Sequence, residues 1–157
     1  MSDSSIDPIL GRVPSGIFIL TATSNGESTG MLASWVMQAG FEPPMVTVAV
    51  KQGRYVEAWL AAGAPFVLNV VGHDDKTLLK HFGRGFEPGA PAFEGVETEP
   101  SSQQVPVLKA ALGHLECKAT SHVASGDHTI FLAEVISGRL HVEDKPMVHV
   151  RKSGRNY

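Results

Sequence analysis

The chain has 157 residues, which suits one domain with a buried core. Apolar residues make up 43% and charged residues 18%, which excludes a disordered chain, and the net charge of -3 excludes the basic surface of a nucleic-acid binder. No apolar run reaches membrane-spanning length and residues 1–8 lack a signal peptide, so the single-cysteine chain is expected in the cytoplasm, with no membrane partner and no disulfide.

The first part of the chain predicts a loose arm followed by a β-hairpin. Residues 1–9 are polar and are taken as the arm of a single domain over 1–157. The apolar run 16–23 predicts a buried strand, and 27–36 is expected to return as the second strand. Asn25-Gly26 between them supplies the positive φ angles of a tight turn.

The middle of the chain mixes strands with short helices. A strand is expected over 45–50, because Pro43-Pro44 forces any earlier strand to end. Residues 54–62 repeat apolar side chains at helical spacing, whereas 66–71 is short and β-rich and predicts a buried strand. A second helix follows, capped by Asp74 or Asp75 and ended by Gly83.

The last part is predicted to be irregular and then β. Residues 84–106 form a long loop rich in Gly, Pro and Glu. Strands are expected over 113–119, with Cys117 pointing inward, over 128–141 and over 147–151. Six or seven largely sequential strands with two short helices predict a β-barrel.

The segment from Ala33 to Arg54 has the side chains that a mononucleotide site needs. Ala33 and Ser34 are small, so their backbone amides stay reachable by a flat, polar-edged molecule, and Trp35 beside them can flank a ring. Lys51 and Arg54 follow the third strand, where they can neutralise a phosphate. The alternative is a barrel strand with small residues and solvated surface cations.

Several motifs follow one another in an order that is more specific than any of them alone. They are Val13-Pro14-Ser15-Gly16, Gly30-Met31-Leu32-Ala33-Ser34-Trp35, Phe41-Glu42-Pro43-Pro44, Phe66-Val67-Leu68-Asn69-Val70, Phe82, Gly126-Asp127-His128 and Tyr157. From about Leu10 to Tyr157 the chain resembles the flavin reductase-like family, and especially the flavin reductase domain of flavodiiron proteins. The resemblance implies a mainly β, Greek-key-like, FMN-binding split β-barrel with two or three short helices.

The resemblance also implies which residues form the site. The cofactor-binding residues would be Met31, Leu32, Ala33, Ser34, Trp35, Lys51, Arg54, Phe82, Gly83, Arg84 and Tyr157. The first five would lie along the isoalloxazine and ribityl, the basic residues near the phosphate, and Tyr157 over the site. Trp35 and Met31 replace the family's commoner Phe and Thr. His128 is the catalytic candidate, positioning the nicotinamide or flavin edge, although pairing with Asp127 alone would also explain it.

No metal is expected. The histidines show no ligand spacing, and His114-Leu115-Glu116-Cys117 lacks the second cysteine pair of a deaminase site. We interpret Cys117 as a buried, structural thiol and not as a nucleophile. No glycine-rich dinucleotide motif is present either, because Gly83-Arg84-Gly85 follows a helix instead of a strand.

The resemblance implies an FMN-dependent oxidoreductase that takes hydride from NADH or NADPH at flavin N5. Electrons would pass to free flavin, ferric iron or a redox partner protein, and the chain would form a homodimer. One rival is an FMN-binding electron-transfer module without nicotinamide turnover. Another is a split-barrel binder of a different ligand such as haem.

Overall fold

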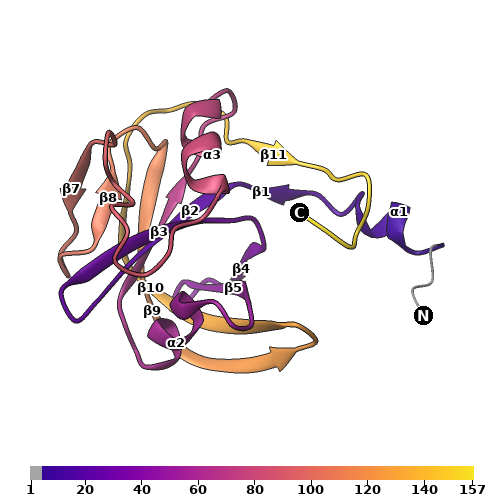
Figure 1. Ribbon diagram of the computed structural model, residues 1–157, viewed down its shortest axis with the longest axis horizontal. Helices are drawn as coiled ribbons and strands as arrows, with labels where there is room; N and C mark the ends of the chain where they lie inside the picture. Colours follow the sequence, from indigo (N-terminus) through magenta and orange to yellow (C-terminus); the bar gives the residue numbers. More distant parts are fainter. Residues whose placement is uncertain (1–4) are drawn as a thin grey trace.

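A computed structural model describes residues 5–157 of the chain (Figure 1). The strands are β1 (Ser15–Gly16), β2 (Phe18–Ser24), β3 (Glu27–Ala33), β4 (Val36–Gly40), β5 (Met45–Lys51), β6 (Phe66–Val70), β7 (Thr98–Pro100), β8 (Pro106–Leu108), β9 (Gly113–Ser125), β10 (His128–Leu140) and β11 (Val148–His149). The helices are α1 (Asp7–Leu10), α2 (Tyr55–Ala61) and α3 (Lys76–Gly83). Over this part of the chain, no helix has the length and apolar character needed to span a bilayer.

The main sheet is antiparallel and has the strand order β3-β2-β6-β9-β10-β5-β4. Its two edge strands, β3 and β4, are consecutive in the sequence and are separated only by Ser34 and Trp35. The sheet therefore curls until its edges meet at these two residues, which gives a split barrel. The predicted mainly β fold with two or three short helices is confirmed.

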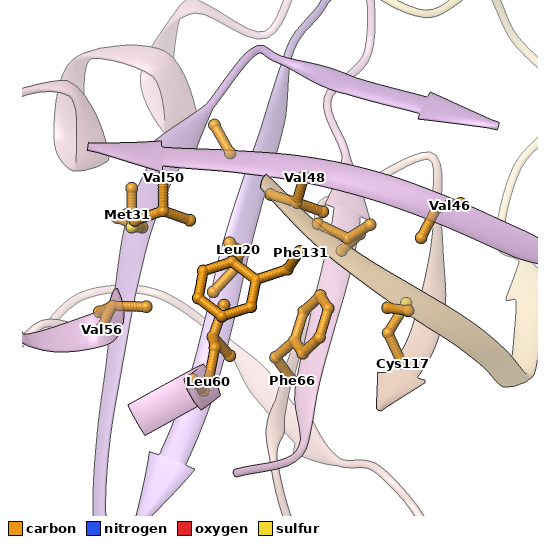
Figure 2. Close-up of a cluster of buried hydrophobic side chains, with 14 residues drawn as sticks. Leu20, Met31, Val46, Val48, Val50, Val56, Leu60, Phe66, Cys117 and Phe131 are labelled. Atoms are coloured by element: carbon orange, nitrogen blue, oxygen red, sulfur yellow. The ribbon is translucent and has the colours of Figure 1, made fainter. Parts of the chain in front are cut away.

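The barrel interior is filled by alternate residues of its strands (Figure 2). Val46, Val48 and Val50 of β5 point inward, and Val48 pairs in register with the buried Phe131 of β10. From α2, Leu60 packs into the same cluster. Because buried and more exposed residues alternate along these strands, the sequence pattern predicted them.

The outer face of β6 is covered by β8 and the chain beside it. Asn69 is fully buried there, and its amide donates to the carbonyl of Ile19 at 2.9 Å while accepting from the backbone N–H of Leu108 at 2.9 Å. Thr21 donates to the carbonyl of Pro106 at 2.6 Å. These bonds satisfy the buried polar groups that hold the β7–β8 hairpin on the barrel.

Helix α3 packs beside β3, in a hydrophobic cluster separate from the barrel core. Its apolar residues Leu78 and Phe82 are buried, and the backbone of Gly30 in β3 leaves room for Phe82. A Cβ on Gly30 would lie 2.7 Å from the Phe82 ring. Asp75 accepts from the backbone N–H of Leu78 at 3.1 Å and is therefore the cap of this helix.

Replacing Asp75 with alanine is expected to lower the free energy of unfolding by about 1 kcal/mol, because one backbone donor of α3 loses its partner. Urea denaturation measures the change. Asp74→Ala is the matched control, since Asp74 is an exposed neighbour that provides no cap. Equal losses in the two variants would contradict the capping role.

The structure differs from the sequence prediction at several strands. β4 was not predicted, and β11 spans only Val148–His149 of the strand predicted over 147–151. The second strand ends at Ala33 instead of residue 36, because the chain there leaves β2 and begins to pair with β5. The strand predicted over 113–119 continues to Ser125, because the exposed residues after Ala119 still pair with β10. The loop 84–106 contains β7, which pairs with β8.

The predicted loose arm also differs where the structure describes it. Asp7–Leu10 forms α1, and the backbone N–H of Gly154 donates to the carbonyl of Asp7 at 2.7 Å. The N–H of Arg151 donates to the carbonyl of Gly11 at 2.8 Å. The first part of the chain is thus tied to the last, as Figure 1 shows for α1, β1 and β11. Residues 1–4 of the predicted arm lie outside the described residues.

Candidate functional site

A cavity of about 390 Å³ lies between β3, β5, α3 and the last segment of the chain. Its lining contains Ile17, Met31, Leu32, Ala33, Ser34, Trp35, Ala49, Lys51, Arg54, Leu79, Phe82, Gly83, Arg84, Gly85, Met147, His149 and Tyr157. Every residue that the sequence analysis assigned to cofactor binding borders this one cavity. The structure therefore brings together residues that lie as far apart in the sequence as Met31 and Tyr157.

The crossover from β3 to β4 forms one wall. Met31 and Ala33 bury their side chains in the barrel, so they present mainly backbone to the cavity. Ser34 and Trp35 belong to neither strand. The Trp35 ring is partly exposed and lies 4.6 Å from His128 and 5.3 Å from Tyr157, measured between ring centroids. This wall combines backbone groups with a flat aromatic surface.

Three cations come from three different elements. Lys51 ends β5, Arg54 precedes α2 and Arg84 follows α3. None of the ion pairs found among residues 5–157 involves any of them. Arg54 and Arg84 also border an adjoining hollow of about 320 Å³. The cavity is therefore bordered by three cationic side chains that make no ion pair within the described residues.

His128 lies behind the cavity wall and does not line it. Its side chain is buried, and Nδ1 lies 2.7 Å from the Asp127 carboxylate. The carboxylate can only accept, so Nδ1 carries a proton, and in the neutral ring Nε2 accepts from the hydroxyl of Tyr157. The hydrogen bond from His128 lowers the pKa of Asp127. Tyr157 therefore lies between His128 and the cavity, and in this arrangement His128 does not reach the ligand edge that the resemblance implied.

Tyr157 keeps its proton in this arrangement. Burial raises the pKa of its hydroxyl above the ordinary value, and nearby Arg54 only partly offsets the effect. A protonated hydroxyl can donate, which is what Nε2 needs when only Nδ1 of His128 carries a proton.

Sequence reasoning missed several lining residues, above all Met147 and His149. A strand over 147–151 was expected, but nothing in that pattern indicated its partner. The structure pairs His149 with Ser15 and Val148 with Gly16, and this pairing carries the segment to the cavity. The place of these two residues depends on pairing between strands far apart in the sequence, which the local sequence does not indicate.

Two other predictions concern groups outside the cavity. Cys117 points inward and is buried, and burial raises the pKa of its thiol to about 12. It is therefore no nucleophile at neutral pH. Among residues 5–157, no group of three or more histidine, cysteine or acidic residues has the geometry to hold a metal ion.

Comparisons with known proteins agree with this geometry. The family model for the flavin reductase like domain matches residues 10–157. Diflavin flavoprotein A 1 of Synechocystis sp. is 41% identical over 157 residues, which is 99% of this chain and 27% of that protein. The chain thus spans about a quarter of the length of the curated relatives it matches.

Solved structures are also similar to this chain over nearly its whole length. The NADH:FAD oxidoreductase SgcE6 of Streptomyces globisporus superposes with a TM-score of 0.84 and 27% identity, over 96% of this chain and 89% of that one. A second structure of that protein, in complex with NAD and FAD fragments, has a TM-score of 0.81 and 26% identity over the same shares.

Proposed function

Because this chain belongs to the flavin reductase-like domain family, we propose that it binds FMN in the cavity and transfers hydride to it from NADH or NADPH. The single observation that carries the proposal is that a flat aromatic wall and three unpaired cations border the same cavity. A mononucleotide has a flat ring at one end and a phosphate at the other. The electrons would then pass to free flavin, ferric iron or a redox partner protein.

The residues present fit such a ligand. The cavity volume of about 390 Å³ falls in the range of about 300–1,000 Å³ that small-molecule sites span. Trp35 offers a ring face, whereas Ile17, Leu79 and Phe82 are apolar residues of the lining. Arg54 and Arg84 approach from two helix ends, so that they can hold a phosphate from two sides.

Each wall would have its own role in the reaction. When bound, FMN accepts a hydride at N5 and releases its electrons one at a time. Backbone N–H groups of Ser34 and Trp35 would donate to the pyrimidine edge of the ring, where negative charge develops on reduction. Arg54 and Arg84 would fix the phosphate, and with it the position of the ring. His128 would orient the donor by a hydrogen bond and move no proton.

A homodimer is part of this proposal. Met37 of β4 and Phe41 in the following turn are 68% and 88% exposed, although both are large and apolar. Exposed apolar surface of this kind is typical of interaction sites, and a twofold contact would cover it. Light scattering on the purified chain tests this, and a monomeric mass would contradict it.

One preparation separates the candidate functions. Purified chain loaded with FMN is expected to show flavin absorbance bands that bleach when NADH or NADPH is added without oxygen. Bands that persist with both donors would instead favour the electron-transfer module. Met147, His149 and Tyr157 border the cavity and are side chains able to ligate haem iron, so a Soret band would favour a haem binder. A protein that takes up no FMN from excess would overturn the proposal.

A further inference from the structure

Tyr157 separates His128 from the cavity. The phenol ring lines the cavity, stands 5.3 Å from the Trp35 ring and donates its hydroxyl proton to Nε2 of His128. The other ring nitrogen of His128 is already held by Asp127. Both nitrogens are thus engaged, and a ligand in the cavity reaches His128 only after Tyr157 has moved.

Residues 153–157, here called the latch, are anchored at a distance from the cavity. The Arg155 guanidinium donates to the Asp7 carboxylate at 2.5 Å, and the N–H of Gly154 donates to the Asp7 carbonyl at 2.7 Å. A Cβ on Gly154 would lie 2.1 Å from the Cβ of Leu10, so only glycine allows this approach to α1. Arg151 also donates to the carbonyl of Asn156 at 2.9 Å. Contacts with α1 therefore fix where Tyr157 stands.

We propose that the latch competes with the nicotinamide ring of the electron donor for the space beside Trp35 and for Nε2 of His128. The inference rests on the proposed function. Both competitors are flat rings with a polar group that can hydrogen-bond to an imidazole nitrogen, the phenol hydroxyl in one and the carboxamide in the other. His128 is then a positioning residue that holds Tyr157 when the latch is closed and the donor when it is open.

The competition has a measurable consequence for donor affinity. A donor that binds only the open form has an apparent dissociation constant equal to its intrinsic value divided by the fraction of molecules in the open form. Removing a contact that favours the closed form is therefore expected to tighten donor binding. One ordinary hydrogen bond corresponds to about 3- to 10-fold.

Two variants open the latch by different means. Tyr157→Phe keeps the ring and removes the bond to His128. Gly154→Ala replaces no residue of the cavity lining and forces the latch away from Leu10. Gly72→Ala is the matched control, because its Cβ would make ordinary contact with Leu112 at 3.9 Å. Calorimetry with NAD⁺ and with NADP⁺ on the FMN-loaded full chain measures donor affinity without turnover.

We expect the nucleotide that binds the wild type to bind both latch variants about 3- to 10-fold more tightly, and the control as before. FMN affinity is expected to stay within about two-fold in Gly154→Ala, because Arg54, Arg84 and Trp35 lie outside the latch and keep their places. Melting temperatures report whether each variant folds. If Gly154→Ala does not fold, Arg155→Gln is used in its place. Arg155 is half exposed, so its replacement leaves the core unchanged, and it removes the contact with Asp7 that anchors the latch.

The outcomes separate the latch from the proposed function. Equal dissociation constants in all proteins would overturn the latch and leave nicotinamide use intact. Weaker binding by Tyr157→Phe would make Tyr157 a contact for the donor and would also overturn it. If FMN binds but neither nucleotide binds any variant, nicotinamide use fails and the latch fails with it. Binding by the latch variants alone would support the inference most strongly.

Discussion

The double variant Arg54→Gln, Arg84→Gln is expected to bind FMN at least about 100-fold more weakly than the wild-type chain. Hydrogen bonds to a charged group contribute about 1.5–3 kcal/mol each, and the two guanidinium groups border the same cavity from the ends of α2 and α3. Quenching of flavin fluorescence on titration with protein measures the affinity.

Riboflavin distinguishes a phosphate contact from general damage to the site. It has the same ring system as FMN and no phosphate, so its affinity is expected to change less than about two-fold in the same variant. Arg139→Gln is the protein control, because Arg139 is an exposed arginine that pairs with Glu99 outside the cavity. Equal losses of FMN and riboflavin would show that the two arginines do not bind the phosphate.

His128→Ala is expected to lower kcat/KM for the nicotinamide donor by about 10- to 100-fold, with FMN affinity largely unchanged. The loss follows from positioning, because hydride transfer between nicotinamide and flavin needs no protein base, and a misplaced ring reacts slowly. Steady-state rates at varied donor concentration measure the effect. His73→Ala is the control, since His73 is a half-exposed histidine that pairs with Asp144 away from the cavity.

The variant also frees Tyr157, so the single substitution contains two opposing effects. Comparing Tyr157→Phe with His128→Ala, Tyr157→Phe isolates the contact of His128 with the donor, because the bond between the two residues is absent from both proteins. Equal kinetics in these two proteins would remove His128 from the reaction.

The sequence was sufficient for those parts of the fold that depend on local pattern. The alternation of Val46, Val48 and Val50 indicates one buried face, and Pro43-Pro44 marks where β5 must restart. Asp75 was one of two acidic residues able to cap α3, and only the hydrogen bond to Leu78 decides between them. Local rules identify an element and leave its exact contacts open.

The parts that could not be predicted depend on which segments meet in space. The residues of β9 after Ala119 are exposed and lack the alternation of apolar and polar side chains that marks a strand. Only their pairing with β10 keeps them extended. His149 reaches the cavity because β11 pairs with β1, which lies at the other end of the chain. The resemblance placed His128 at the ligand, whereas the contact with Tyr157 appears only in three dimensions.

Asn69 has a consequence for how the barrel chooses among its own possible alignments. If β6 shifted by one position against β2, the amide would face the apolar interior, and the groups at Ile19 and Leu108 would lose their bonds. Valine at the same place would tolerate either alignment. One buried carboxamide in β6, the strand that lies between β2 and β9, therefore penalises any other alignment of these strands.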